Sequence, residues 1–273
     1  MAELDVNGQT YYFEVAGTGP PLVLLHGFTG SGANWQHLVP LFAERYRTIT
    51  IDLLGHGRTS APPDPHRYGM AEVAADVAAL LDAVAAQPVH LLGYSMGGRL
   101  ALFMAVTAPE RVRSLVLESS SPGLDTEEGR AARRQRDSAL ADSIEREGIP
   151  AFVGKWEKLP LFASQNSLRE SIRHALRQQR LRNRAPGLAN SLRGMGTGRQ
   201  PSLWGRLDQL NAPVLILAGA QDEKFAAIGR RMAKLLPDAR LEVVPEAGHT
   251  IHLEQPQEFS SRTLACLQEQ RLQ

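Results

Sequence analysis

The sequence predicts an α/β protein built on a mostly parallel, doubly wound sheet with helices on both faces. Short apolar runs bounded by turn residues, typical of buried strands, alternate with segments whose apolar residues recur at helical spacing. The run 89–92 leads directly into a glycine-rich turn, which is followed at once by a helix-like segment. Alternation of this kind favours parallel strands, because each helix returns the chain to the same end of the sheet.

The elements follow in order along the chain. The expected strands are 11–15, 22–25, 48–51, 89–92, 112–117, 214–217 and 241–244. Residues 17–21, Gly-Thr-Gly-Pro-Pro, form a turn signal between the first two strands, which predicts a β-hairpin-like opening. An amphipathic helix is expected over 70–86, since Val73, Val77, Leu80 and Val84 recur at three- and four-residue steps.

The alternation stops after Glu118 and resumes near residue 214. Residues 122–199 are rich in Arg, Gln, Ala and Glu and have no β-branched runs, so we expect a helical cap inserted over the sheet. The core then comprises 1–121 and 200–273. Between Asp125 and Arg199 there are 15 basic and 9 acidic residues, against 15 and 20 in the remainder. A basic insertion in an acidic body indicates either a solvated helix face or a pocket for a small anion.

Composition excludes several other classes of protein. Hydrophobic residues make up 43% and charged residues 22% of the 273, with a net charge of +1, as in ordinary globular proteins. No apolar run reaches the length of a membrane span, and the acidic N-terminus is unlike a secretory signal. Cys266 is the single cysteine, so no internal disulfide can form. Aromatic residues do not interleave the arginines, which argues against nucleic acid as a partner. We therefore expect a cytoplasmic enzyme without membrane insertion, and the sequence gives no oligomeric state.

A G-x-S-x-G pattern at 93–97 places Ser95 between an expected strand and an expected helix. At such a turn the serine backbone is strained, and the flanking glycines let the chain bend back on itself. The turn lifts the hydroxyl to the top of the sheet, at the positive end of a helix. The alternative is a glycine-rich turn with an incidental serine, but the strand before it and the helix after it favour a reactive serine.

A reactive serine needs a base, and the base needs an acceptor that holds its tautomer. Asp222 and His249 each follow a later strand, at the sheet edge where ligand sites lie in such folds. Asp52 and Glu118 are the competing acids. Asp52 introduces a turn, in which a side-chain-to-backbone hydrogen bond is the simpler explanation. Glu118 also ends a strand and stays open as an alternative, although the motif favours Asp222.

Two backbone amides are expected to form an oxyanion hole. They are those of Phe28, in the loop after the strand 22–25, and of Met96, directly after the serine. His26 precedes the first of these and should shape its loop by hydrogen bonding. His249 and His252 have an H-x-x-H spacing, but without a third ligand this pair is weak evidence for a metal. We therefore expect no metal. We also expect no nucleotide cofactor, because no P-loop or G-x-G-x-x-G element is present.

The chain resembles α/β-hydrolase-fold proteins throughout its length. The resemblance rests on LHGFTGS at 25–31, DLLGHGRTS at 52–60, GYSMGG at 93–98, GAQDEKF at 219–225 and AGHTIHLEQP at 247–256. More narrowly, it resembles the 2-succinyl-6-hydroxy-2,4-cyclohexadiene-1-carboxylate synthases of menaquinone biosynthesis. That match rests on Arg99, LESSSPGL at 117–124, AARRQRD at 131–137, KWEKLPLF at 155–162 and RAPGLANSLRGMGTGRQPSLW at 184–204.

The narrower resemblance implies a cofactor-free lyase that eliminates pyruvate from a small polycarboxylate. It implies catalytic Ser95, Asp222 and His249, and substrate contacts from Tyr94, Arg99, Arg133, Trp156 and Arg180. Arg177, Arg182 and Arg184 stay open as alternatives to Arg180 for this substrate contact. The motifs of the fold alone also fit a carboxylesterase, a carbon–carbon bond hydrolase or a non-catalytic binding protein.

Overall fold

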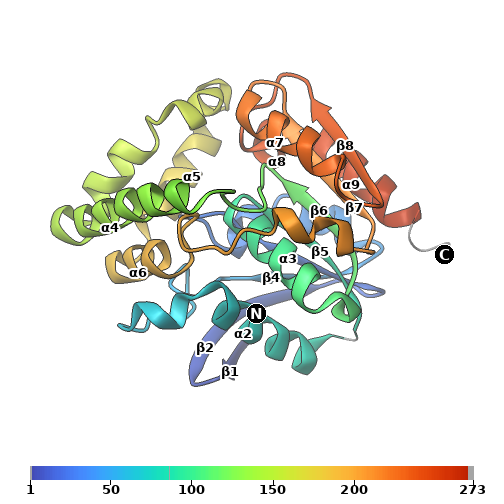
Figure 1. Ribbon diagram of the computed structural model, residues 1–273, viewed down its shortest axis with the longest axis horizontal. Coiled ribbons are helices and arrows are strands. Elements are labelled where there is room, and N and C mark those ends of the chain that lie inside the picture. Colours follow the sequence, from blue (N-terminus) through green and yellow to red (C-terminus); the bar gives the residue numbers. More distant parts are fainter. Residues whose placement is uncertain (1, 86, 270–273) are drawn as a thin grey trace.

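The computed structural model describes residues 2–85 and 87–269, and an eight-stranded sheet runs through its centre (Figure 1). The spatial order is β1-β2-β4-β3-β5-β6-β7-β8. The pairs β1–β2 and β2–β4 are antiparallel and all later pairs are parallel, which confirms the predicted fold class. The strands are β1 (Ala2–Val6), β2 (Gln9–Ala16), β3 (Pro21–Leu25), β4 (Arg47–Ile51), β5 (Val89–Tyr94), β6 (Val112–Glu118), β7 (Val214–Gly219) and β8 (Ala239–Val244).

Helices cover both faces of this sheet. The helices in the described residues are α1 (Val39–Ala43), α2 (Met70–Val84), α3 (Met96–Thr107), α4 (Glu127–Trp156), α5 (Glu170–Leu181), α6 (Ala185–Met195), α7 (Glu223–Ala233), α8 (Ile251–Glu254) and α9 (Pro256–Glu269), of which α4, α5 and α6 belong to the segment between β6 and β7. Alternate residues of β3 belong to different cores. Val23 and Leu25 pack in the cluster that contains α2 and α3, whereas Leu22 and Leu24 pack in the cluster of α1 and α9. Because the side-chain period of a strand is two, continuous apolar runs are what a sheet covered on both faces requires.

The predicted opening hairpin is wrong. β2 pairs with β1 and β4, and the parallel strand β4 separates it from β3. The hairpin is β1–β2, joined by Asn7 and Gly8, both at positive φ. The alternation in AELDV and the Asn-Gly pair were the signals that would have found it. Residues 17–21 carry the chain past the end of α1, and a Cβ at Gly17 would collide with the carbonyl oxygen of Ala43.

The segment between β6 and β7 is mainly helical, as predicted. In it, α4, α5 and α6 lie together on one side of the molecule, and α4 kinks at Gly148, where φ is +80°. α4 and α6 share a separate apolar cluster that includes Ile144, Phe152, Leu188 and Leu192, against which Phe28 of the core packs. We retain 122–199 as the proposed cap, and "cap" denotes this segment below.

Some expectations fall on residues outside the described part of the chain. Ala86, at the expected end of the helix 70–86, is one, and the outer ends of the proposed core, at Met1 and 270–273, are the others. Within the described residues, no helix is both long and apolar enough to span a bilayer.

Candidate active site

Ser95 lies at the junction of β5 and α3 with φ +50° and ψ −104°, a conformation that L-residues rarely adopt. Its amide donates to the carbonyl oxygen of Glu118 at 2.8 Å, which ties the turn to the end of β6. The bend is possible because Gly97 has no side chain: a Cβ at this position would collide with the carbonyl oxygen of Leu25. This is the strained strand-to-helix turn that the G-x-S-x-G pattern predicts.

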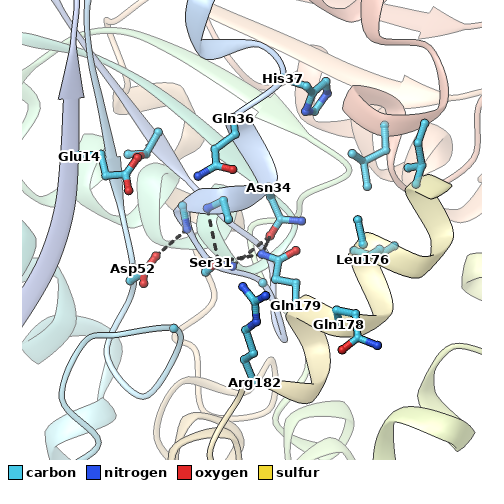
Figure 2. A pocket seen from close by; sticks show the side chains of 18 of the residues that line it. Glu14, Ser31, Asn34, Gln36, His37, Asp52, Leu176, Gln178, Gln179 and Arg182 are labelled. Atoms are coloured by element: carbon cyan, nitrogen blue, oxygen red, sulfur yellow. Dashed lines mark hydrogen bonds between the residues drawn. The ribbon is translucent and has the colours of Figure 1, made fainter. Parts of the chain in front are cut away.

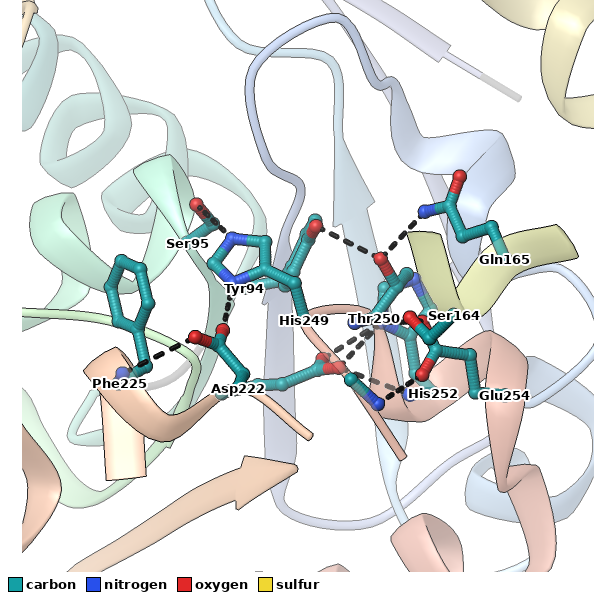
Figure 3. Close-up of polar contacts among 12 residues, drawn as sticks. Tyr94, Ser95, Ser164, Gln165, Asp222, Phe225, His249, Thr250, His252 and Glu254 are labelled. Atoms are coloured by element: carbon teal, nitrogen blue, oxygen red, sulfur yellow. Dashed lines mark hydrogen bonds and ion pairs between the residues drawn. The ribbon is translucent and has the colours of Figure 1, made fainter. Parts of the chain in front are cut away.

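The structure brings Ser95, His249 and Asp222 into one hydrogen-bonded row (Figure 3). His249 Nε2 lies 3.1 Å from Ser95 Oγ, and His249 Nδ1 lies 2.6 Å from Asp222 Oδ2. A carboxylate can only accept, so Nδ1 carries the proton and Nε2 is left to accept from the serine hydroxyl. Asp222 is held in turn by the amide of Phe225, 3.3 Å from its Oδ1. His249 and Asp222 are buried.

The competing acids have other partners. Both oxygens of Glu118 face His252. Glu118 Oε2 lies 2.7 Å from His252 Nδ1, and Glu118 Oε1 accepts from the amide of His252 at 3.0 Å. Asp52 accepts the amides of Gly32 at 2.6 Å and Arg58 at 2.8 Å, so it organises turns by backbone hydrogen bonds. The acid within reach of His249 Nδ1 is Asp222.

His26 shapes the loop that carries Phe28, as predicted. It is fully buried, its Nδ1 lies 2.8 Å from the Gly27 carbonyl oxygen, and its Nε2 accepts from the amide of Leu53 at 3.0 Å. These two hydrogen bonds define a neutral imidazole that joins the loops after β3 and β4. Phe28 and Met96 both line the cavity at Ser95, and their roles as oxyanion donors stay predictions.

We expect the free energy of unfolding to decrease as the pH falls from about 6.5 to about 4. Burial lowers the pKa of His26 from 6.5 to about 4. The unfolded chain then binds a proton that the folded chain excludes, which favours unfolding by up to about 3 kcal/mol. Urea denaturation across this pH range should show a steeper loss in the wild type than in His26→Gln. Equal slopes would contradict the prediction.

A cavity of about 220 Å³ opens on Ser95 and His249, between the core and the cap. Tyr94, Arg99, Arg133 and Trp156, four of the five predicted substrate contacts, line it. Its wall includes apolar side chains from both parts of the chain. They are Phe28, Leu140, Leu161, Phe162, Leu192, Phe225 and Ile228. Enclosure by apolar groups strengthens the electrostatic interactions of the few charges at such a site.

Arg99 and Arg133 supply positive charge to this cavity. Arg99 is 9% exposed, and its Nη1 donates to the carbonyl oxygen of Met195 and to Gln200 Oε1, each at 2.9 Å. Burial, and secondarily the charge of Arg133, lower the pKa of Arg99 to about 10, so it stays a cation at neutral pH. Arg133 Nε donates to Asp137 Oδ1 at 2.7 Å.

The fifth residue, Arg180, lies outside the cavity at Ser95. Its guanidinium stacks 5.3 Å from the ring of Phe162 and donates to Gln165 Oε1 at 3.1 Å. It lines a small neighbouring cavity with Phe28, Tyr94 and Phe162, three residues that also border the cavity at Ser95. Contact between Arg180 and substrate therefore stays a prediction.

Sequence reasoning missed much of the cavity wall, including two aromatic side chains beside His249 and one cation. The ring centroids of Phe162 and His249 lie 6.1 Å apart in an edge-to-face arrangement, and those of Phe225 and His249 lie 4.7 Å apart. Lys224 is a further cation in the wall. All three fall within motifs quoted above, KWEKLPLF and GAQDEKF, but the spacing of a motif does not show which of its side chains face the serine.

A second, larger groove of about 910 Å³ runs between α5 and the loop after β3 (Figure 2). Gln179 of the cap crosses it and donates to Ser31 Oγ and Asn34 Oδ1, each at 2.8 Å. No residue of the row Ser95–His249–Asp222 lines this groove, so we place the chemistry in the smaller cavity. Among the described residues, no group of three or more His, Cys, Asp or Glu side chains is placed to hold a metal ion.

Comparison with known proteins agrees with this geometry. The model of the α/β hydrolase fold family matches residues 20–256. A protein of Bacillus subtilis (strain 168), provisionally named 2-succinyl-6-hydroxy-2,4-cyclohexadiene-1-carboxylate synthase, is 51% identical over 251 residues, covering 90% of this chain and 91% of the relative. The synthase of that name from Serratia proteamaculans (strain 568) is 32% identical over 243 residues, 89% of this chain and 91% of its own.

A solved structure agrees as well. MenH from S. aureus superposes with a TM-score of 0.91 at 40% identity, over 96% of this chain and 98% of that one. The protein is therefore a member of the α/β hydrolase fold family. Within that fold, it belongs to the family of 2-succinyl-6-hydroxy-2,4-cyclohexadiene-1-carboxylate synthases.

Proposed function

We propose that the protein is a carbon–oxygen lyase of menaquinone biosynthesis, with Ser95, His249 and Asp222 as its catalytic residues. Its reaction eliminates pyruvate from 2-succinyl-5-enolpyruvyl-6-hydroxy-3-cyclohexene-1-carboxylate and leaves 2-succinyl-6-hydroxy-2,4-cyclohexadiene-1-carboxylate. The observation that carries the proposal is the pairing of a hydrogen-bonded serine–histidine–aspartate row with two arginines in one enclosed cavity. An anionic substrate fits these guanidinium groups, whereas an apolar ester offers no negative charge to pair with them.

The row supplies a base for proton abstraction. His249 Nε2 accepts the proton of Ser95 Oγ, and the serine oxygen takes the proton from the ring carbon next to the succinyl ketone. The electrons of that C–H bond form the new ring double bond, the existing double bond shifts, and the C–O bond to the enolpyruvyl group breaks. The departing enolate takes up the proton held by His249 and becomes pyruvate, while Ser95 keeps the proton taken from the ring carbon. In this proposal, neither a metal nor an organic cofactor takes part.

Backbone amides would stabilise the charge on the ketone oxygen during this step. The amides of Phe28 and Met96 are the proposed donors, since both residues border the cavity beside Ser95. Arg99 and Arg133 would hold carboxylates of the substrate, with Tyr94 and Trp156 completing the wall. The direct test is pyruvate release from the cyclohexene substrate, measured by coupling to lactate dehydrogenase. A wild-type enzyme that releases none would refute the proposal.

An ester or carbon–carbon bond hydrolase is the alternative function. A thermophilic esterase from Thermogutta terrifontis, solved with malate bound, superposes with a TM-score of 0.86 at 26% identity over 99% of both chains. Oxyanion stabilisation is the same electrostatic task in ester hydrolysis and in enolisation, so the three catalytic side chains do not separate the two reactions.

We expect no covalent intermediate on Ser95 with the cyclohexene substrate. In the proposed reaction the serine takes a proton and does not attack a carbonyl carbon, whereas a hydrolase passes through an acyl-enzyme. Intact-mass measurement of enzyme quenched during turnover should show the unmodified chain. An adduct that forms in a burst and localises to Ser95 would favour the hydrolase.

A further inference from the structure

Glu254, the last residue of α8, folds its side chain back over the loop that carries His249 (Figure 3). Its Oε2 accepts from the amide of Gly248, and its Oε1 accepts from the amide of Thr250 at 3.3 Å. Gly248 and Thr250 are the two residues that flank His249. One carboxylate thus holds the backbone on both sides of the catalytic histidine.

The cap reaches the same carboxylate. Ser164, in the 3₁₀ segment Pro160–Ser167, donates its hydroxyl to Glu254 Oε1 at 2.9 Å. Its side chain also packs directly on the loop, because a Cβ at Gly248 would collide with Ser164 Oγ. The next residue, Gln165, donates to Thr250 Oγ1 at 2.8 Å. Two consecutive cap residues therefore contact the residues on either side of His249.

Capping of α8 explains only part of this arrangement. A carboxylate that accepts an amide at the start of its own helix is common, and the contact with Thr250 is of that kind. Gly248 lies before the helix and its N-cap, however, and Ser164 belongs to another element. Neither contact caps an amide of the helix: one holds the amide of Gly248, and the other fixes the Glu254 carboxylate that holds it.

The position of His249 is demanding because its two ring nitrogens serve different partners. Nε2 must stay within hydrogen-bonding distance of Ser95 Oγ while Nδ1 stays 2.6 Å from Asp222. A displacement of about 1 Å in the backbone of His249 would break one of these contacts, and misplacement of that size can cost about 10²-fold in rate.

We propose that Glu254 is a positioning residue for His249, acting through the amides of Gly248 and Thr250, and that Ser164 extends this support from the cap. The inference rests on the proposed role of His249 as the base. Glu254 itself contacts neither Ser95 nor the cavity in which substrate would bind.

The test compares Glu254→Ala with the wild type in two kinds of assay. In pyruvate release, we expect kcat to fall about 10- to 100-fold and KM to change less than about two-fold, because the groups that would bind substrate are untouched. In the free enzyme, a fluorophosphonate probe reads the serine directly: Ser95 Oγ displaces fluoride from phosphorus while His249 accepts the serine proton. Its rate should fall by a similar factor.

A proton NMR spectrum adds a readout that loss of stability alone would not move. The His249 Nδ1 proton, bonded to Asp222, should resonate at low field in the wild type and should shift or broaden in Glu254→Ala well below its melting temperature. Glu254→Gln, which keeps one acceptor oxygen, should recover part of the rate. Ser164→Ala should give a smaller effect of the same kind.

Matched controls lie close by. Glu258→Ala removes an exposed acid of α9 that pairs with Arg262, and Ser167→Ala removes a hydroxyl of the cap segment that donates to the Ser164 carbonyl oxygen. Both should behave as the wild type. A folded Glu254→Ala with wild-type phosphonylation and an unshifted resonance would overturn the inference. If the wild-type enzyme is phosphonylated but releases no pyruvate, the proposed lyase function is refuted instead. The probe and the NMR spectrum would still decide the role of Glu254.

Discussion

Ser95→Ala is expected to lower kcat for pyruvate release about 10²- to 10⁴-fold, the range for loss of a positioned proton-transfer group. The fold should survive, because the strained turn is held by the amide of Ser95 and by close glycine packing, neither of which uses the hydroxyl. Steady-state kinetics with the coupled assay, together with circular dichroism and thermal melting, separate loss of chemistry from loss of structure.

The control for this prediction is a double-mutant cycle. His249→Ala should be about as impaired as Ser95→Ala, and the double variant should be little worse than either one, since the two side chains act as a unit across the 3.1 Å contact. Full additivity of the two effects would show that they do not share one catalytic step.

Arg99→Ala is expected to lower kcat/KM about 10- to 150-fold, which corresponds to about 1.5–3 kcal/mol for one charge-assisted contact to a substrate carboxylate. Arg99 also holds the Met195 carbonyl oxygen and Gln200, so we expect a fall in melting temperature as well. Arg99→Lys should restore the charge without the paired geometry and so recover only part of kcat/KM. Activity should also decrease as ionic strength rises, because salt screens the attraction of an anionic substrate.

The choice of control for Arg99 depends on the structure. Arg130 and Arg134 donate to the carbonyl oxygens of Leu124 and Gly198, so their replacement disturbs the cap itself. Arg146 is exposed and pairs with the neighbouring Glu147, which makes Arg146→Ala the matched control. Equal losses in Arg99→Ala and Arg146→Ala would indicate a diffuse field of positive charge instead of a specific contact.

Much of the fold is readable from local pattern. The apolar runs identified every parallel strand. Most residues of the inner strands β3 to β7 are buried, and strands covered on both faces are rich in apolar residues. Strand pairing was not readable at the N-terminus: the turn signal at 17–21 does not show that β4 inserts between β2 and β3. Pairing between strands distant in sequence depends on contacts that no local turn reports.

The position of the reacting groups was also largely a property of the sequence. A glycine-flanked serine after an apolar run has few ways to turn, and acids and histidines that end parallel strands meet at one edge of the sheet. Sequence alone left Glu118 open beside Asp222. Only the tertiary structure assigned them different partners, because the loop after β8 turns His249 toward Asp222, whereas α8 brings His252 to Glu118.

The cap shows which features the sequence alone does not determine. Its composition determined that it would be helical and basic, since helix propensity and charge are carried by each residue alone. Which arginines border the cavity at Ser95 was decided by packing between distant segments: Arg133 of the cap and Arg99 of α3 border it, whereas Arg180 does not. The contact of Ser164 with Glu254 likewise joins residues 90 positions apart. Such contacts depend on how helices dock and which rotamers of long side chains fit, and neither is encoded at a single position.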